Sequence, residues 1–186
     1  MTEVDFTALL ARVKAGDAAA MSRLFAMFNP KLVRFLVATD AAVAEDLASE
    51  VWMTMIRGVQ EFAGSSTDFR VWMFSIARRR ASEQRRRDTR KPCHPHDATH
   101  FIHLPGGDDP AALVIAEMTG DDAAAFVAAT LPPDQAQVVV LRVLLDLDVS
   151  EVATVMGRSA NWVRVTQHRA LRRLADRLGS TTDVVR

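Results

Sequence analysis

The chain has 186 residues, 49% hydrophobic and 25% charged, the proportions of an ordinary globular protein. Its 23 basic and 23 acidic side chains balance, but they are unevenly distributed: most charged residues within 78–91 are basic, whereas 108–122 contains acids and no base. There is no apolar run of about 18 residues and no charged-then-apolar leader, so we expect no membrane insertion and a cytoplasmic location; the single cysteine excludes an intramolecular disulfide.

Apolar residues recur with helical spacing along most of the chain, and β-type alternation is scarce. The sequence therefore predicts an all-α fold of two small helical domains, at 1–90 and 110–186. A flexible linker is expected at 91–109, because prolines and glycines cluster there. We expect helices at 3–15, 17–37, 43–59, 68–87, 110–129, 133–146, 150–156 and 159–178.

The helix expected at 43–59 separates an apolar stripe from an acidic face. Acids in its first turn complement the helix dipole, which accounts for Glu45 and Asp46. Glu50 lies further along and adds to an acidic surface that is weak evidence for a partner. The predicted buried stripe is Leu47, Val51, Trp52, Met55, Ile56 and Val59. The predicted outward face is Glu45, Asp46, Ser49, Glu50, Met53 and Arg57.

A loop at 64–67 leads into a strongly basic helix, whose core face is predicted to be Phe69, Trp72, Met73, Ile76 and Ala77. Phe74 falls on the opposite side, together with Arg70, Arg78, Ser82 and Arg85. An aromatic ring beside arginines suits single-stranded nucleic acid, because stacking contributes about 1–3 kcal/mol per base while the arginines follow the phosphates. A partly covered surface phenylalanine is the alternative interpretation.

The expected linker holds five potential metal ligands, enough in number for a zinc or copper site. The spacing argues against one, because there is no CxxC pair and two prolines stiffen the start of the segment. We therefore expect no metal and no cofactor, with metal sensing as the alternative. The five residues are Cys93, His94, His96, His100 and His103.

Residues 150–178 have the form of a helix-turn-helix. Gly157 can reverse the chain without a Cβ penalty after a short apolar helix, and Ser159 is a natural N-cap for a second helix. One face of this second helix is apolar, through Val163, Ala170, Leu171, Leu174 and Leu178. The other face is polar and cationic, through Asn161, Arg164, Val165, His168, Arg169, Arg172 and Arg173.

Position along this second helix separates two kinds of DNA contact. In helix-turn-helix proteins its N-terminal part enters the major groove, where Asn and Arg pair with base edges, and later arginines neutralise phosphates. A solvated face on an ordinary helical hairpin is the alternative. Asp176 is the one acid among six arginines at 157–178, whereas a helix built for solubility interleaves acids, so DNA binding is favoured.

Three segments in this order resemble the extracytoplasmic-function (ECF) sigma factors, a branch of the sigma-70 family of bacterial RNA polymerase. AEDLASEVW is similar to the core-binding helix, FRVWMFSIARRRA to the promoter-melting helix, and LPPDQAQVVVLRVLLDLDVSEVATVMGRSANWVRVTQHRALRRL to the C-terminal DNA-binding domain. The resemblance covers nearly the whole chain. It implies a specificity subunit without a catalytic site, which is a monomer when free, binds polymerase core and promoter DNA, promotes DNA opening and is controlled by an anti-sigma factor.

The resemblance also implies three sets of contacts. The polymerase partners would be the clamp helices of the large subunit and the flap, with the clamp contacts made by Asp46, Ser49, Glu50 and Met53. The non-template strand of the minus-ten element would be held open by Ser65, Ser66, Arg70, Phe74, Arg78, Arg79 and Arg85. The minus-thirty-five duplex would be read by Ser159, Ala160, Asn161, Arg164, Val165, His168, Arg169 and Arg172.

The chain departs from the family pattern at Ser49, where Gln is usual, and at Ser75 and Arg79, where Arg and Asn are commoner. Asn161-Trp162 and Val165-Thr166 replace a Gly-Thr and a Ser-Arg, so promoter preference does not transfer. Trp162 is expected to pack between the two helices. Two other classes stay open: a repressor would normally dimerise on a palindrome, and an enzyme built on the linker cluster would need an ordered pocket.

Overall fold

The computed structural model describes residues 2–88 and 110–182, and all regular structure within those ranges is helical, as predicted. None of these helices is long and apolar enough to cross a membrane. The N-terminal half contains α1 (Glu3–Lys14), α2 (Ala18–Val37), the 3-10 turn η1 (Ala41–Val43), α3 (Ala44–Gly58) and α4 (Ser66–Asp88). The C-terminal half contains α5 (Pro110–Glu117), α6 (Gly120–Thr130), α7 (Pro133–Val139), η2 (Val140–Leu144), α8 (Val149–Met156) and α9 (Ala160–Thr182).

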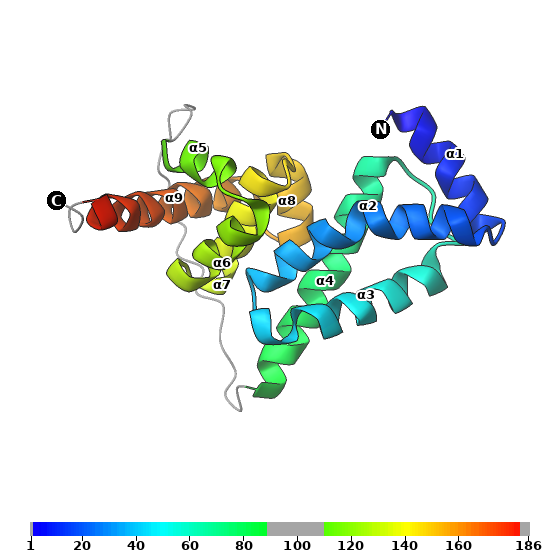
Figure 1. Cartoon of the computed structure of the whole chain (residues 1–186), viewed down its shortest axis with the longest axis horizontal. Helices are drawn as coiled ribbons and strands as arrows, with labels where there is room; N and C mark the ends of the chain where they lie inside the picture. The colour runs from blue at the N-terminus through cyan, green and yellow to red at the C-terminus, as the bar shows by residue number, and fades with distance from the viewer. Residues whose placement is uncertain (1, 89–109, 183–186) are drawn as a thin grey trace.

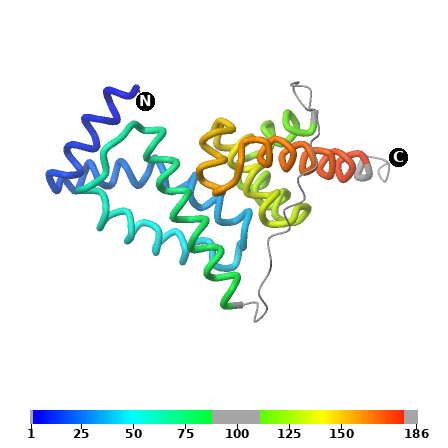
Figure 2. The backbone as a smooth tube through the Cα atoms, turned by 180° about the vertical axis from the view of Figure 1, so that it is seen from behind, coloured from blue at the N-terminus to red at the C-terminus, as the bar shows by residue number. Residues whose placement is uncertain are grey.

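The two halves occupy opposite ends of the molecule, and α9 extends away from the N-terminal half toward the C-terminus (Figures 1 and 2). Residues 91–109, the expected linker, lie outside the described residues. The Cys93, His94, His96, His100 and His103 cluster lies outside them too. Within the described ranges no group of His, Cys, Asp or Glu could hold a metal ion.

Aromatic side chains form the core of the N-terminal half. Phe69 of α4 lies 5.6 Å from Phe6 of α1 and 4.9 Å from Phe28 of α2, measured between ring centroids. Trp52 of α3 is buried and donates its indole N–H to Asn29 Oδ1 of α2 at 3.0 Å. These contacts hold α3 and α4 on α2, which places the acidic and the basic helix beside each other.

Two expected helices of the C-terminal half differ from the prediction. The helix expected at 110–129 is two helices, because Thr119 adopts a non-helical conformation and its hydroxyl accepts a hydrogen bond from the backbone N–H of Asp122. The helix expected at 133–146 is α-helical only to Val139 and continues as the π-helical turn η2. It is followed by Asp146 at φ +50°, in the left-handed region.

The predicted helix-turn-helix is confirmed as a structure by its caps. Asp148 and Glu151 form a capping box at the start of α8, and Gly157 ends that helix in the left-handed conformation at φ +59°. The hydroxyl of Ser159 then accepts the backbone N–H of Trp162 at 3.2 Å, as an N-cap does. The turn between α8 and α9 is therefore specified by residues that the sequence already singled out.

The two halves pack against each other, α4 along α8 and α2 along α6. The side chain of Gln137, fully buried on α7, donates to the Thr39 hydroxyl after α2 at 2.8 Å. In the described ranges three ion pairs also cross this contact: Arg34 with Asp121, Arg70 with Glu151, and Arg85 with Asp134. The contact therefore combines a packed apolar part with paired charges.

Candidate nucleic-acid interface

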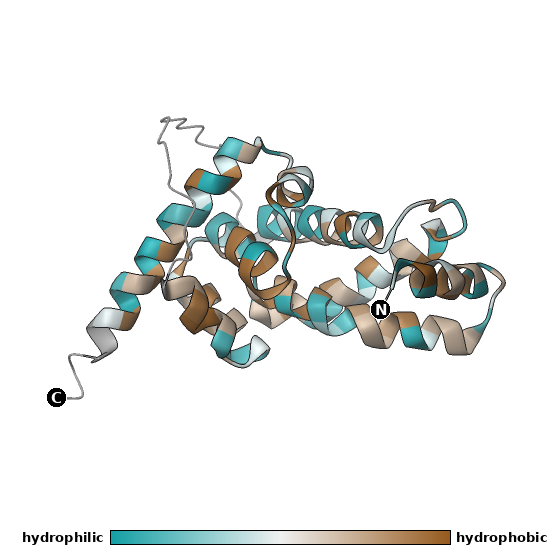
Figure 3. Cartoon of the chain, turned by 90° about the horizontal axis from the view of Figure 1, so that it is seen from above, coloured by the Kyte–Doolittle hydropathy of each residue, from teal (hydrophilic) through white to brown (hydrophobic). Residues whose placement is uncertain are grey.

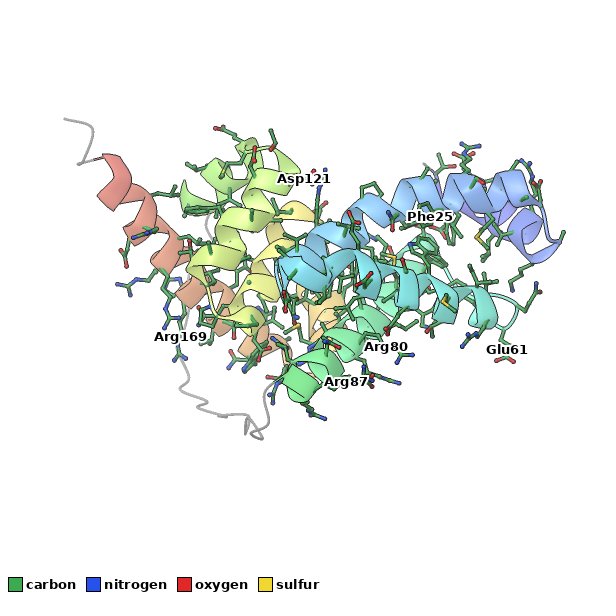
Figure 4. All side chains as sticks on the ribbon, turned by 60° about the horizontal axis from the view of Figure 1, so that its bottom comes forward. Phe25, Glu61, Arg80, Arg87, Asp121 and Arg169 are labelled. Atoms are coloured by element: carbon green, nitrogen blue, oxygen red, sulfur yellow. The ribbon has the colours of Figure 1, made fainter. Side chains whose placement is uncertain are left out.

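The predicted reading face of α9 is largely open to solvent. Arg164, Arg169 and Arg172 are exposed, and Figure 4 shows Arg169 projecting outward from α9. Asn161 and His168, which complete this face, are half-buried. In Figure 3 hydrophilic and hydrophobic residues alternate along this helix, which leads to the C-terminal label. The first turns of α9 thus carry the Asn161 amide and the exposed Arg164 guanidinium, groups of the kind that pair with base edges.

The prediction that Val165 belongs to this outward face is wrong. Val165 is buried, with 8% of its surface exposed, and so is the neighbouring Thr166. The reason is that α9 packs on both α7 and α8, so its covered face is wider than one apolar stripe. Trp162 is half-buried against the core, as expected, and its ring lies 5.5 Å from the Arg158 guanidinium, in cation–π range.

The loop before α4 is held by two carboxylates. Ser65 donates its backbone N–H and its hydroxyl to Asp68 Oδ2 at 2.8 and 2.7 Å, which lowers the pKa of Asp68. Ser66 donates its backbone N–H and its hydroxyl to the Glu3 carboxylate of α1, both at 2.9 Å. Both predicted minus-ten serines are therefore engaged inside the chain, and Glu3 is a loop contact to which the sequence interpretation assigned no role.

The prediction that Phe74 points outward is wrong. Its side chain is fully buried and its ring lies 5.3 Å from that of Phe35 on α2. The reason is that α2, α3 and α8 all pack on α4, so its covered surface is wider than one apolar stripe and includes the position that meets α2. A stacking contact between Phe74 and an unpaired base is incompatible with this position.

The arginines predicted beside Phe74 lie at the contact between the two halves. Arg70 donates to the Leu145 carbonyl oxygen at 3.4 Å and lies 3.6 Å from Glu151 Oε1. Arg78 is half-buried, its Nε has no hydrogen-bond partner among the described residues, and burial lowers the pKa of its guanidinium although Asp134 opposes that shift. Of the four predicted minus-ten arginines on α4, Arg79 is the one classed as exposed.

The acidic face of α3 is exposed, as the helical spacing predicted. Glu45, Asp46, Ser49 and Glu50 are all open to solvent, although the Ser49 hydroxyl also donates to the Glu45 carbonyl oxygen at 3.1 Å. Glu50 lies 3.9 Å from Arg80 of α4, a pair that solvent screens. Arg80 and Arg87 lie on α4 (Figure 4).

An apolar patch adjoins this acidic face. Met53 is 54% exposed, and Ile56, which was predicted to be buried, is 50% exposed. Phe25 of α2 is also exposed, and its ring lies 5.0 Å from that of Trp52 (Figure 4). Ile56 lies one turn after Trp52, which contacts Asn29 and Phe25 of α2, but half of its own surface stays open. No sequence signal distinguished Phe25 from a core residue.

The comparison with known proteins assigns the chain to a family. The family model for Sigma-70 region 2 matches residues 24–91, and the model for Sigma-70 region 4 matches residues 127–174. The ECF RNA polymerase sigma factor ShbA of Streptomyces griseus is 30% identical over 180 residues, which span 90% of this chain and 92% of ShbA. The chain belongs to the ECF sigma factors. Another ECF sigma factor, SigD of Mycobacterium tuberculosis, is 27% identical over 183 residues, 95% of this chain and 85% of SigD.

Solved structures have the same fold as this ECF sigma factor. CnrH, in complex with the cytosolic domain of CnrY, superposes with a TM-score of 0.61 at 19% identity, covering 92% of this chain and 96% of CnrH. RpoE of Bartonella quintana, in complex with the anti-sigma factor NepR, superposes with a TM-score of 0.59 at 18% identity, covering 86% of this chain and 96% of RpoE. The region 2 match contains α3 and α4, and the region 4 match contains α8 and the part of α9 that carries the predicted reading face.

Proposed function

We propose that this ECF sigma factor binds the RNA polymerase core, directs it to specific promoters and promotes the opening of promoter DNA. The observation that carries the proposal is the presence of two different basic helices: α4 lies inside one matched segment of the family, and the first part of α9, with its basic face, lies inside the other. A helix-turn-helix repressor needs only the second of them. Residues 1–90 would form the unit for polymerase and the minus-ten element, and residues 110–186 the unit for the minus-thirty-five element.

The polymerase contact is proposed on the outer face of α3. Asp46 and Glu50 supply negative charge and Met53 supplies exposed apolar surface beside them, a combination suited to a basic helical partner such as the clamp. Phe25 and Ile56 extend the apolar part of the same surface. Ser49 lies between the acids but its hydroxyl is directed to its own helix, which supports a minor role. The flap is the second proposed polymerase contact.

The minus-thirty-five contact is proposed on the first turns of α9. Ser159 and Ala160 begin the helix, Asn161 and Arg164 follow at the depth where base edges are read, and Arg169 and Arg172 are placed for phosphates. His168 stands between the two groups. Val165 is left out of this contact because it is buried.

The minus-ten contact is proposed for the loop Ser65–Ser66 and for Arg70, Arg78, Arg79 and Arg85 of α4, without Phe74. Since Arg70 and Arg85 are paired with acids of the C-terminal half, DNA must replace those acids for this contact to form. Control by an anti-sigma factor is supported by RpoE, which has the same fold and was solved with the anti-sigma factor NepR. A monomeric free state is proposed with it.

The test is in vitro transcription with purified bacterial core polymerase on a pool of genomic promoter fragments. Specific start sites that appear only when the protein is added support the proposal. Arg164→Ala and Arg169→Ala are expected to reduce these transcripts while core binding is unchanged, and Arg177→Ala, at the far end of the same helix, serves as the matched control. Shifts of duplex DNA without polymerase, together with no new transcripts, would instead indicate a repressor.

A further inference from the structure

The basic residues at the contact between the halves are not confined to α4. Arg34 of α2 pairs with Asp121 of α6 across this contact at 3.0 Å, and Lys31 lies three residues earlier, on the same face of α2. Burial lowers the pKa of the Lys31 ammonium most, and the charges of Arg70 and Arg34 lower it further. Lys31 is half-buried and no acid is paired with it among the described ion pairs. This is an excess of positive charge that the contact does not neutralise.

We define the α2–α4 basic surface by five residues that share this side of the N-terminal half. Along α4 it extends over 15 residues, or about 22 Å at 1.5 Å per residue, which is close to the length of about six stacked nucleotides at 3.4 Å each. Its position facing α6, α7 and α8 follows from the ion pairs that join it to those helices. The surface consists of Lys31, Arg34, Arg70, Arg78 and Arg85.

Carboxylates of the C-terminal half occupy this surface at three points. Asp121 Oδ1 accepts from Arg34 Nε at 3.0 Å, and the Arg34 guanidinium lies so close to the backbone of Gly120 that a Cβ there would be 2.5 Å from it. Glu151 lies 3.6 Å from Arg70, with 12% of its side chain exposed. Asp134 lies 4.0 Å from Arg85 and also acts on Arg78. The carboxylates thus place single anionic oxygens along a row of arginines, as the phosphates of a bound DNA strand would.

We propose that Lys31 and Arg34 extend the DNA-binding surface of α4 onto α2, and that Asp121, Asp134 and Glu151 cover this surface in the free chain in place of DNA phosphates. The inference rests on the proposed function for the identity of the ligand as DNA. It adds two phosphate-binding residues on a helix to which neither the sequence nor the family match assigns DNA contact. It also gives the C-terminal half a second role, in which its acids keep the free chain from binding DNA.

The covering acids are tested with the double substitution Asp134→Asn and Glu151→Gln. Glutamine keeps the capping box of α8, and asparagine keeps the size of the side chain, so the fold is retained while both charges are lost. The matched control neutralises two acids away from α4, Glu117→Gln on α5 and Asp176→Asn on α9. The readout is fluorescence anisotropy of a labelled 20-nucleotide single strand of mixed sequence, without polymerase.

We expect the double variant to bind this strand about tenfold more tightly than the wild type at low salt, since two ion pairs no longer compete with phosphate. The control variant should change affinity by no more than about threefold, which measures the effect of net charge alone. Small-angle X-ray scattering should give a larger radius of gyration for the double variant. Equal affinities for the double variant and its control, or an unchanged radius, would overturn the covering role.

Lys31 and Arg34 are tested with Asp121→Asn added to the double variant, so that Arg34 loses its covering carboxylate as well. Lys31→Ala with Arg34→Ala should weaken binding several-fold and reduce the slope of log affinity against log salt by about 1.4, which is two contacts at about 0.7 each. Arg23→Ala with Arg57→Ala removes two exposed cations elsewhere in the same half and should leave the slope unchanged. Equal slopes in both pairs would overturn the assignment of α2.

The transcription assay separates this inference from the proposed function. If the wild type supports specific transcription with core polymerase but neither double substitution changes DNA binding, the sigma function stands and the inference is wrong. If no variant supports transcription, the proposed function fails, whatever the binding data show.

Discussion

Replacement of Phe74 by alanine distinguishes a core residue from a base-stacking residue. Phe74 is fully buried and packed on Phe35, so its truncation should lower the free energy of unfolding by about 3–5 kcal/mol, the range for large aromatic residues in cores. Leucine at the same position keeps most of the volume and should cost less than about 1.5 kcal/mol. An exposed phenylalanine would change stability by only about 0.5 kcal/mol.

The assay is urea denaturation followed by far-ultraviolet circular dichroism. With a slope of about 2 kcal/mol per molar urea, a loss of 4 kcal/mol, near the middle of the range, moves the midpoint down by about 2 M. Phe25→Ala is the matched control, because Phe25 is 44% exposed and its truncation should cost below about 2 kcal/mol. A midpoint for Phe74→Ala within experimental error of the wild type would refute the buried position and restore the stacking interpretation.

Other predictions concern the helix-turn-helix and the acidic face of α3. Gly157→Ala should destabilise the chain by about 1–2 kcal/mol in thermal melts, because φ is +59° and the added Cβ meets no atom within 4 Å, so the cost is conformational. Asp148→Ala should lower the melting temperature at pH 6, because hydrogen bonds from Ser150 and from the Glu151 backbone stabilise the Asp148 carboxylate and lower its pKa. This stabilisation is present above the unfolded pKa near 3.8, and it should vanish as the pH falls through the folded pKa. Charge reversal at Asp46 and Glu50 should weaken competition for core polymerase without changing the circular dichroism spectrum, and undiminished competition would remove α3 from the interface.

Local rules predicted the helix-turn-helix well because its determinants are local. A glycine at the left-handed cap, a serine at the N-cap and an apolar repeat in α9 act within a few residues of one another, and the structure has all three. The same holds for the outward acids of α3, whose position follows from the helical repeat alone. These features required no knowledge of which helices meet in the fold.

The errors occur where a second helix covers a face that periodicity assigns to solvent. A helical repeat identifies the most apolar face, but it does not reveal that α2, α3 and α8 all pack on α4 and that Phe74 meets Phe35 of α2. Val165 was misplaced for the same reason, because α9 packs on two neighbours. Ile56 is the converse case: it has the spacing of a core residue but is 50% exposed. Long-range packing decides all three positions.

The balance of acidic and basic residues in the chain is partly seen as ion pairs between its two halves. Its arginines are concentrated on α4 and α9. Among the described residues, Arg70 and Arg85 of α4 meet acids on α8 and α7 of the other half, whereas Arg164, Arg169 and Arg172 on the predicted reading face of α9 are exposed. Under the proposed function the two DNA contacts would therefore differ in the free chain: one open, the other covered. The Arg34–Asp121 and Arg85–Asp134 pairs are partly exposed and therefore individually weak, whereas the Arg70–Glu151 pair is shielded from solvent. A partner that separates the halves must break this shielded pair before phosphates can replace the carboxylates. Under the same proposal, polymerase binding at α3, on the same half as α4, would supply the energy that separates the halves. Opening of the minus-ten surface would then depend on the enzyme that uses it.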